Sequence, residues 1–504
     1  MTNKGNLNLK KEGVEEVGRV RTRFAPSPTG MVHIGNLRTA LFAWLLAKSK
    51  AGDFLVRIED TDQKRFQEEA TKKILETLNW MGMDIDEGVC VNSEGEIDQK
   101  GGWGPYIQSQ RLGFYKKYAE KLVAEGKAYY CFCDSQRLEE VRKTQQARKQ
   151  PPMYDGACRE IPPEEAKERA KKENCVIRLK TPRDKKVEFK DKVFGKISVD
   201  SNTIDDQILI KSDGFPTYHL AVVVDDYLMG ITHIVRGEEW IPSAPKHVLL
   251  YAFLGWPLPN FVHLPNVLGE NKKKLSKRQG DVSVEEFQKK GYLPEALMNF
   301  LALLGWNPKS NQEIFSKEEL IKKFDEKGLH KAGAVFDYKK LDWINGYYIR
   351  QKEDEEVYRL CKPYLDNYLK ENDFQSDEEK LQKIVVVEKE RMKKLSDITE
   401  KIHFYFSVPK YEKDLLRWKE MKDVELKQAL QKMKQALEEI EDFENLKEIQ
   451  DKITIACGEQ KGEHLWPLRV ALSGEKQSPS PFEIAWILGR KKALERVEKA
   501  IEKI

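Results

Sequence analysis

The stretch RFAPSPTGMVHIGNLRTALFAWLL, from Arg23 to Leu46, combines residue types that could bind a phosphate group. Its first residues are typical of a strand, and the two prolines and the glycine that follow force the chain to turn. After Asn36 the apolar residues recur at helical spacing, which predicts a helix. His33 and Gly35 would lie at its N-terminus, where free N–H groups and the helix dipole attract phosphate and a glycine lets a nucleotide approach the backbone. An ordinary loop in which His33 only caps the helix fits the same residues.

A second stretch, ENKKKLSKRQGD from Glu270 to Asp281, is strongly basic and precedes another expected helix. Lys274, Ser276 and Lys277 could bring positive charge and a hydroxyl to a phosphate under attack. A solvated basic loop is the alternative, since most lysine runs are exposed. The sequence contains no Walker A pattern, which excludes P-loop chemistry.

The elements that must position these residues change character once along the chain. Up to about residue 350, β-branched runs alternate with helical patterns, and the runs are DFLVRIED, NCVIRLK, DQILIK, LAVVVDD and ITHIVRGEE. Strands separated by helices predict an α/β domain with a largely parallel sheet. A cysteine-bearing segment at about 100–175 interrupts this pattern as an insertion. Beyond 350 the apolar residues recur every three or four positions in a Lys/Glu/Leu-rich sequence, which predicts packed helices.

Length and composition limit the class of protein. A chain of 504 residues is long enough for three or four domains, and a net charge of +4 gives no overall basic footprint. Seven cysteines, an odd number, argue against a disulfide framework and for the reducing cytoplasm. No signal peptide or membrane span is expected, and residues 1–18 are expected to form a flexible polar tail.

The two phosphate-binding stretches resemble the HIGH and KMSKS signatures of class I aminoacyl-tRNA synthetases, written here as HIGN and KLSKR. Further segments narrow the resemblance to the bacterial-type glutamyl-tRNA synthetases: TRFAPSPTG, LVRIEDTD, GPYIQSQRLGFY, SDGFPTYHLAVVVDDYLMGITHIVRGEEW, LPEALMNFLALLGW and PLRVALSG. The resemblance covers residues 20–504. It departs from the family pattern at Asn36, which replaces the second histidine of HIGH, and in a longer N-terminal tail.

The resemblance implies a Rossmann-like catalytic domain at 19–350. This domain would include an acceptor-stem-binding insertion at about 100–210 and a stem-contact region at about 270–350. An all-α anticodon-binding region of two subdomains would follow at 351–504. The implied protein is a cytoplasmic, monomeric glutamate–tRNA ligase. It would activate L-glutamate with ATP and Mg²⁺ to glutamyl-adenylate and pass the glutamyl group to the 3′ end of tRNA(Glu).

The same resemblance implies a role for individual residues. The catalytic residues would be His33, Gly35, Asn36, Lys274 and Lys277, and Ser276 and Glu239 would join them in binding ATP. The glutamate-binding residues would be Arg23, Ala25, Ser27, Glu59, Tyr218 and Arg236. The chemistry fits, because arginine binds a carboxylate through two parallel charge-assisted bonds and a glutamate side chain suits the substrate ammonium.

Three cysteines of the insertion suggest a metal site. Cys131 and Cys133 lie in YYCFCD, and Cys158 lies in YDGACRE. In many family members this spacing binds structural zinc, with a histidine two residues after the last cysteine. Glu160 occupies that position here, and none of the eight histidines lies within the insertion. Two interpretations remain open: a zinc site with Glu160 as its fourth ligand, and three thiols left from a lost site.

Arg391, in VVVEKERMKKLSDI, aligns with an arginine that reads the third anticodon base in family members charging only glutamate tRNA. A guanidinium suits the acceptors of cytosine and opposes the donors of guanine. A shift of the alignment would put Lys389 or Lys393 there instead.

Three other functions are weighed against this one. A nucleotidyltransferase without tRNA would be shorter and lack the helical third, and a non-catalytic tRNA-binding scaffold need not keep both signatures and the arginine pair. A glutaminyl-tRNA synthetase would carry β-barrel anticodon domains.

Overall fold

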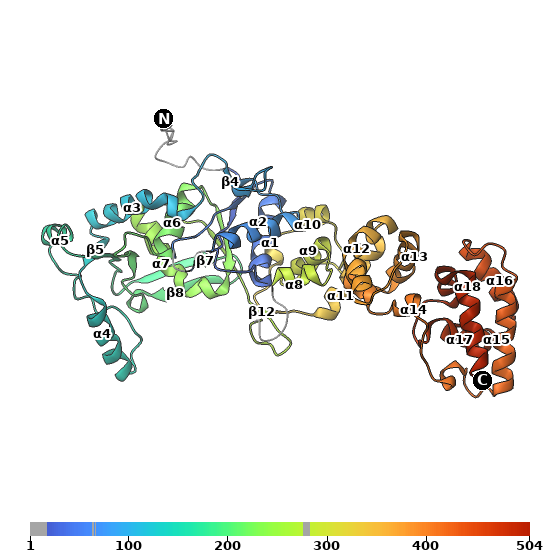
Figure 1. Cartoon of the computed structure of the whole chain (residues 1–504). Coiled ribbons are helices and arrows are strands. Elements are labelled where there is room, and N and C mark those ends of the chain that lie inside the picture. The colour runs from blue at the N-terminus through green and yellow to red at the C-terminus, as the bar shows by residue number, and fades with distance from the viewer. Residues whose placement is uncertain (1–17, 63–64, 66, 276–282) are drawn as a thin grey trace. The chain divides into compact units, whose positions relative to one another are not determined.

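The computed structural model describes residues 18–62, 65, 67–275 and 283–504 (Figure 1). The expected N-terminal tail, apart from residue 18, lies outside the described residues, as do Ser276 and Lys277 of the basic stretch. The chain divides into two compact units. The first comprises the described residues up to Glu286 with Leu297–Asp337, and the second comprises Phe287–Ala296 and Tyr338–Ile504. The main part of the second unit therefore begins before the boundary expected at 350.

Two four-stranded, mostly parallel sheets support the first unit, in the orders β1-β2-β3-β4 and β10-β11-β7-β8. Their strands are β1 (Arg21–Phe24), β2 (Asp53–Val56), β3 (Glu87–Val91), β4 (Ile97–Lys100), β7 (Lys186–Asp191), β8 (Gly195–Asp200), β10 (His233–Gly237) and β11 (Asn260–Leu264). Only the pairs β3–β4 and β7–β8 of these described sheets are antiparallel. β1 lies beside β10, where the N–H of Thr232 donates to Arg21 O at 3.0 Å. The predicted α/β fold with a largely parallel sheet is confirmed.

Helix α1 (Ile34–Ser49) follows β1 through the proline-containing turn, as predicted, and packs against β1 and β2. This unit also contains the helices α2 (Glu68–Trp80), α3 (Leu112–Ala124), α6 (Tyr218–Leu228), α7 (Ala244–Leu254) and α10 (Lys317–Lys323). Helices α8 (Val284–Lys289) and α9 (Pro294–Leu303) each contain a point at which the chain passes between the units. The strands β12 (Val267–Leu268) and β13 (Ala334–Val335) form a short parallel pair in the first unit.

The run LAVVVDD was predicted as a strand, and this is wrong: residues 220–226 lie inside helix α6. All seven are buried, so the run carries neither the alternation of a half-buried strand nor the stripe of a surface helix. A short, wholly buried apolar run has no periodicity that separates the two structures. Tertiary packing of this segment against α3 and α7 therefore determines that it is a helix.

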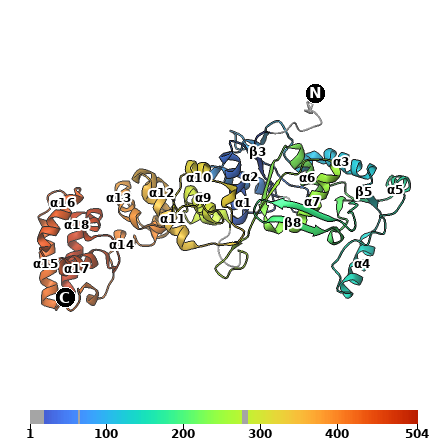
Figure 2. The ribbon, with the colours of Figure 1, turned by 180° about the vertical axis from the view of Figure 1, so that it is seen from behind.

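The insertion contains an antiparallel sheet of order β5-β6-β9, formed by β5 (Ala128–Cys131), β6 (Val176–Leu179) and β9 (Ile208–Ile210). Helix α5 (Pro163–Ala170) packs on β5. Helix α4 (Ser135–Ala147) has no buried residue and extends away from the sheets in both views (Figures 1 and 2). The hairpin β7–β8 does not join this sheet, because β7 pairs with β11. Part of the insertion expected at 100–210 therefore belongs to the sheet β10-β11-β7-β8.

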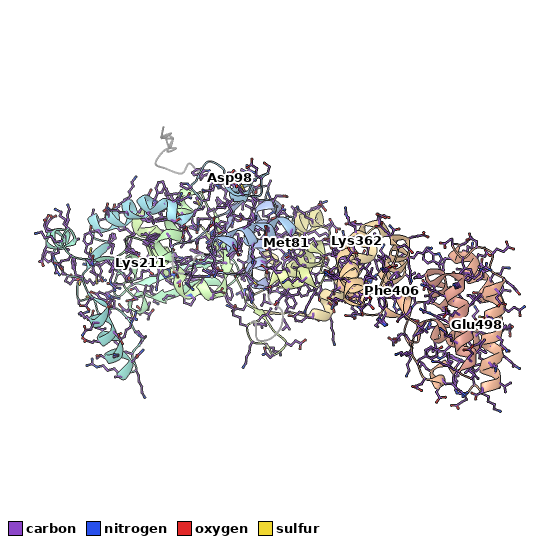
Figure 3. All side chains as sticks on the ribbon, viewed as in Figure 1. Met81, Asp98, Lys211, Lys362, Phe406 and Glu498 are labelled. Atoms are coloured by element: carbon purple, nitrogen blue, oxygen red, sulfur yellow. The ribbon has the colours of Figure 1, made fainter. Side chains whose placement is uncertain are left out.

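The second unit is helical throughout residues 338–504, all of which are described, and contains no strand there. Its helices are α11 (Tyr338–Gln351), α12 (Asp354–Glu371), α13 (Glu378–Glu388), α14 (His403–Phe406), α15 (Asp423–Glu438), α16 (Leu446–Cys457), α17 (Lys461–Ser473) and α18 (Pro481–Glu502). Charged residues such as Lys362 and Glu498 are exposed on it (Figure 3). The predicted helical final third is confirmed. Among the described helices of the whole chain, none combines the length and the apolar character needed to span a membrane.

Candidate active site

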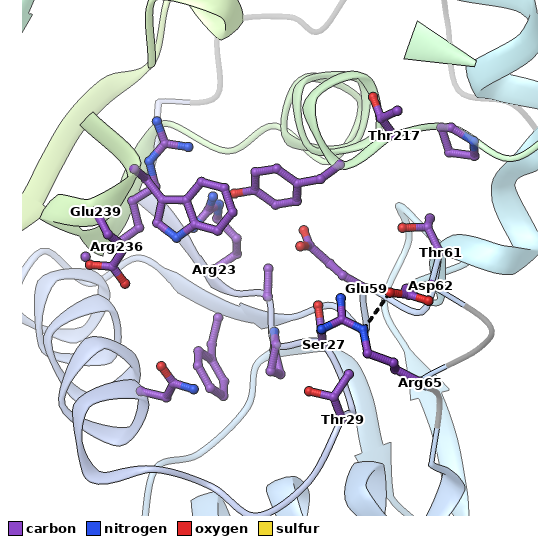
Figure 4. A pocket seen from close by; sticks show the side chains of 18 of the residues that line it. Arg23, Ser27, Thr29, Glu59, Thr61, Asp62, Arg65, Thr217, Arg236 and Glu239 are labelled. Atoms are coloured by element: carbon purple, nitrogen blue, oxygen red, sulfur yellow. Dashed lines mark hydrogen bonds and ion pairs between the residues drawn. The ribbon is translucent and has the colours of Figure 1, made fainter. Parts of the chain in front are cut away.

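A cavity of about 950 Å³ in the first unit is lined by the end of β1, the segment after β2, the start of α6 and the segment after β10 (Figure 4). The carboxyl ends of parallel strands meet at one edge of a sheet, which is where α/β proteins bind ligands. Eight of the thirteen residues predicted to bind ATP or glutamate line this cavity: Arg23, Ala25, Ser27, Asn36, Glu59, Tyr218, Arg236 and Glu239. Arg236 and Glu239 lie on one side in Figure 4, and Thr61, Asp62 and Arg65 lie on the other.

The N-terminus of α1 is capped by His33, whose Nδ1 accepts a hydrogen bond from the N–H of Gly35 at 3.0 Å. A Cβ on Gly35 would lie 3.3 Å from that nitrogen, so the glycine leaves room for the capping ring. Because Nδ1 accepts, a neutral His33 carries its proton on Nε2, which makes Nε2 a donor. Asn36 is exposed on the cavity wall, whereas neither His33 nor Gly35 lines the cavity.

The two ends of the basic stretch are both held near α1 and the cavity. Before it, the exposed Lys274 places its Nζ 4.0 Å from Oε1 of the cavity residue Glu239. After it, the N–H of Val284 donates to Val32 O at 3.1 Å, in the turn that leads into α1. The structure therefore brings the stretch that contains His33 and the described part of the basic stretch, both predicted to bind phosphate, to one region of the first unit.

A buried group of charges connects Arg23 to Glu59. Arg23 Nε donates to both carboxylate oxygens of Asp226, at 3.1 and 3.2 Å. Arg57 then joins the two carboxylates, since its Nη1 donates to Asp226 Oδ1 at 2.8 Å and its Nη2 to Glu59 Oε1 at 3.0 Å. Burial would raise the pKa of Asp226, but Arg23 and Arg57 together lower it. Burial raises the pKa of Glu59 to about 6, although Arg57 opposes the shift.

Arg236 is 5% exposed and is held by two histidines, His263 and His247, at 3.0 and 3.1 Å. Burial lowers its pKa from the ordinary arginine value. Its Nη2 is buried and has no hydrogen-bond partner within the described part of the chain. An unsatisfied buried donor costs about 1–3 kcal/mol, so its place on a cavity wall fits a ligand that brings an acceptor oxygen.

Tyr218 begins α6, and its ring lies 4.3 Å from the ring of Trp240 between their centroids. Both residues line the cavity, and burial raises the pKa of the Tyr218 hydroxyl, which therefore stays protonated as a donor. The pair forms an aromatic wall with one polar group.

Sequence reasoning missed several cavity residues. Trp240, Lys211 and Arg65 line the cavity, and Arg57 and Asp226 orient the residues that do. For Arg57 a signal was present in RIED, because residues two apart on an extended segment face the same side, and Arg57 shares a side with Glu59. Asp226 offered no such signal, since it lies 203 residues from Arg23.

The three cysteines of the insertion come together in the structure, with their sulfur atoms all within 4.8 Å of one another. Cys133 and Cys158 have Sγ atoms 3.6 Å apart, close to the separation of about 3.8 Å for two thiolates that bind one tetrahedral zinc at about 2.3 Å. The hydroxyl of Tyr154 lies 3.3 Å from the Sγ atoms of both Cys131 and Cys133. The donor set therefore fits zinc.

Glu160 does not join this cluster. Its side chain is 80% exposed, and its Oε1 lies 3.6 Å from Arg159 and 3.7 Å from Lys180. The fourth position beside the three sulfurs is occupied by the Tyr154 hydroxyl, which sequence reasoning overlooked although Tyr154 begins the segment YDGACRE.

Arg391 ends a single turn of 3₁₀ helix, Lys389–Arg391, that follows α13 in the second unit. Its Nη1 lies 3.9 Å from Oε2 of the buried Glu388. Lys389, one alternative in the alignment, is buried and donates to Lys352 O and, at 2.8 Å, to Asp354 Oδ1. Lys393, the other, is exposed like Arg391. Burial and bonding within the protein thus remove Lys389 as a reader of an anticodon base.

Comparison with known families matches both parts of the chain. The family described as "tRNA synthetases class I (E and Q), catalytic domain" matches residues 19–343, and an "Anticodon binding domain" matches residues 356–501. The second unit is helical and matches an anticodon-binding domain. A nucleotidyltransferase would lack this unit, and a glutaminyl-tRNA synthetase would have β-barrels in its place, so both alternatives disagree with the structure.

Individual relatives and structures agree with these matches. The chain is 48% identical over 500 residues to a glutamate–tRNA ligase of Finegoldia magna, covering 97% of this chain and 100% of the relative. It is 44% identical over 489 residues to the ligase of Clostridioides difficile, covering 95% and 98%. A crystal structure of a glutamate tRNA ligase from Elizabethkingia meningosepticum, in complex with its amino acid, superposes with a TM-score of 0.84 at 36% identity, covering 96% and 99%. The chain therefore belongs to the class I tRNA synthetase family for glutamate and glutamine, as a member of its glutamate–tRNA ligases.

Proposed function

We propose that the cavity of the first unit is where this ligase forms glutamyl-adenylate before it charges tRNA(Glu). An oxygen of the glutamate α-carboxylate attacks the α-phosphorus of Mg²⁺-bound ATP, and pyrophosphate leaves. A ribose hydroxyl at the 3′ end of tRNA(Glu) then attacks the activated carbonyl, and AMP leaves. The observation that carries the proposal is that Arg23, Arg236 and Glu59 line one cavity beside the start of α1.

The charges of the cavity suit glutamate. Arg236 offers an unpartnered donor to a carboxylate, and the Glu59 carboxylate suits the substrate ammonium. Arg23, Ser27 and Tyr218 add polar groups around them, and Ala25 leaves space. These positions are supported by the geometry of the wall and by the family match.

The ATP phosphates are proposed to bind at the start of α1, next to Glu239. His33 Nε2–H and Asn36 would donate to them, and Gly35 keeps the cap that orients His33. Lys274, with Ser276 and Lys277 of the same stretch, would stabilise the charge that develops on the reacting phosphate. No covalent enzyme intermediate is needed, so catalysis is positioning and electrostatics.

ATP–pyrophosphate exchange tests the proposal directly. We expect exchange with glutamate and much weaker exchange with glutamine, each measured with and without tRNA(Glu). Equal exchange with the two amino acids would contradict the assignment of the cavity to glutamate.

The ionisation of Glu59 predicts a pH effect on glutamate binding. The carboxylate must be ionised to attract the ammonium, and its pKa is raised to about 6. As the pH falls through this value, Glu59 takes up a proton and the KM for glutamate is expected to rise. The Glu59→Gln variant should have a high KM that no longer changes over this range. A parallel pH dependence in wild type and variant would show that another group is responsible.

We propose that the insertion binds a structural zinc through Cys131, Cys133 and Cys158, with the Tyr154 hydroxyl in the place first expected for Glu160. Sulfur spacing and the two 3.3 Å approaches of the hydroxyl support this set. Zinc would supply no chemistry to the reaction; it would tie β5 to the loop that contains Cys158.

Metal analysis of the purified protein is expected to find about one zinc per chain. Tyr154→Phe should lose zinc to a chelator faster than wild type, because one ligand is removed and the packing of the ring is kept. Glu160→Gln is the matched control and should retain zinc as wild type does. Zinc-free protein with full charging activity would establish that the site has been lost.

Arg391 is proposed to read the third anticodon base and to favour the cytosine of glutamate tRNA. Charging of glutamate and glutamine tRNA transcripts in parallel should show a preference for the first, about 1–3 kcal/mol in free energy. Arg391→Gln should reduce the preference for glutamate tRNA over glutamine tRNA. Lys393→Gln is the matched control and should leave this preference unchanged. Equal charging of both transcripts by the wild type would contradict the proposal.

A further inference from the structure

Arg23 and Arg236, the two arginines of the cavity wall, are held in different ways. Arg23 donates to the carboxylate of Asp226, so a full negative charge lies against it. Arg236 donates to two imidazole rings: its Nε lies 3.0 Å from His263 Nε2, and its Nη1 lies 3.1 Å from His247 Nδ1. No carboxylate of the described residues lies within ion-pair distance of Arg236.

The direction of these hydrogen bonds follows from arginine chemistry. A guanidinium only donates, so His263 Nε2 and His247 Nδ1 must both be unprotonated acceptors. His263 then carries its proton on Nδ1, which lies 2.7 Å from Asp191 Oδ2. His247 carries its proton on Nε2, which lies 3.0 Å from Nδ1 of His219. Both rings are therefore neutral, each in a single tautomer.

The surroundings support these neutral tautomers. His263 and His247 are 0% and 1% exposed, and burial lowers the pKa of each histidine. Asp191 is itself fixed, because its Oδ1 accepts from the N–H groups of Val193 and Phe194 at 2.8 and 2.7 Å. Burial would raise the pKa of Asp191, but the hydrogen bond from His263 and these backbone bonds lower it, so it stays an acceptor.

We propose that His263 and His247 are positioning residues that hold Arg236 for the substrate carboxylate and, being neutral, leave its positive charge uncompensated. Asp191 fixes the tautomer of His263, and His219 fixes that of His247, each through the ring nitrogen that does not face Arg236. Arg236, and not the ion-paired Arg23, then distinguishes the charged glutamate from the neutral glutamine. The inference rests on the proposed function, because it takes Arg236 as a glutamate-binding residue.

The physical reason lies in what a partner does to an arginine. A carboxylate partner holds a guanidinium but cancels much of its field, whereas a neutral imidazole accepts the same hydrogen bond without adding charge. Two acceptors on adjacent edges also fix the plane of the guanidinium, so that Nη2 is kept in one place. Such orientation lowers the entropy lost when a ligand binds.

The test compares His263→Leu with His263→Gln, measuring KM and kcat for glutamate and glutamine in ATP–pyrophosphate exchange, together with the melting temperature. Leucine removes the acceptor, and glutamine can place an amide oxygen near the position of Nε2. His263→Leu is expected to raise the KM for glutamate about tenfold or more, as for the loss of one hydrogen bond to a charged group, with a smaller change for glutamine. His263→Gln should recover most of the loss.

His247→Asn and His247→Leu form a second matched pair, because an asparagine oxygen can replace Nδ1. If His263→Leu does not fold, the KM for glutamate of this second pair tests the proposal.

His233→Leu is the control, since His233 lies on the same strand as Arg236 but on its opposite face. It is expected to change stability without changing the preference for glutamate. A shift of the glutamate KM by His233→Leu equal to that of His263→Leu would overturn the proposal.

Coupling to Arg236 separates a positioning role from an independent one. In an Arg236→Leu background, His263→Leu should change the KM for glutamate little further, because the residue through which it acts is gone. Full additivity of the two losses, or no effect of His263→Leu on KM in the wild type, would overturn the proposal. If Arg236→Leu itself leaves the KM and the preference for glutamate unchanged, the proposed function of Arg236 fails instead.

Discussion

Arg236→Leu is expected to abolish the preference for glutamate over glutamine. Removal of the guanidinium leaves the substrate carboxylate buried without its partner, a loss of about 2–5 kcal/mol in transition-state binding. Glutamine carries no charge and should lose much less. The measurement is kcat/KM for both amino acids in ATP–pyrophosphate exchange, with melting temperature as the check on folding.

Arg236→Lys is the matched variant for this prediction. Lysine keeps the positive charge but cannot offer the planar fork, and it has fewer donors for His263 and His247. We expect it to keep part of the preference while losing affinity. Equal losses for glutamate and glutamine in Arg236→Leu would show that Arg236 is structural and that the polar groups of the cavity must be reassigned.

His33→Ala is expected to slow adenylate formation by about 10²-fold or more, the scale for losing one transition-state donor. Two functions of His33 must be separated, because Nδ1 caps α1 through the Gly35 N–H, whereas the proposed contact with phosphate is made by Nε2. His33→Asn keeps a side chain suited to capping and removes the Nε2 donor. If donation to phosphate is what matters, the two variants should be slowed alike.

Stability distinguishes the two functions of His33 further. Loss of the cap in His33→Ala should lower the free energy of unfolding by about 1 kcal/mol, whereas His33→Asn should retain it. Binding of tRNA should change little in either variant. Normal activation by His33→Asn would mean that only the cap is needed. Lys277→Ala, predicted from the sequence alone, is expected to slow activation on the same scale, also without a large change in tRNA binding.

Some properties of this protein were determined by the sequence itself, because they depend on residues close together in the chain. Two prolines and a glycine after a short strand force a turn, and helical periodicity after Asn36 gives α1. The three-to-four-residue repeat of apolar residues likewise gave the helical final third. The motifs that resemble a known family also placed Arg23, Glu59 and Arg236, and all three line one cavity.

Local signals failed where the alternatives look alike over a short segment. LAVVVDD is buried on every side, so neither the strand period nor the helix period could separate the two structures, and packing against α3 and α7 accompanies its folding as α6. At the cysteine cluster, Glu160 held the sequence position of a ligand, but its side chain points to Arg159 and Lys180. The Tyr154 hydroxyl reaches the sulfurs instead, because the chain folds back between Tyr154 and Cys158 so that the N–H of Cys158 donates to that hydroxyl at 2.9 Å.

Only the tertiary structure decided which residues support the site. Asp226 joins Arg23 to Arg57, and His263 and Asp191 hold Arg236 from the neighbouring strands β11 and β7. Arg236, His263 and Asp191 are far apart in sequence and meet because β10, β11 and β7 pair side by side in parallel. The spacing of residue types along the sequence predicts periodicity, turns and caps, because these depend on residues that are close together in the chain. It does not record strand order, and strand order determines which buried acceptor meets which arginine.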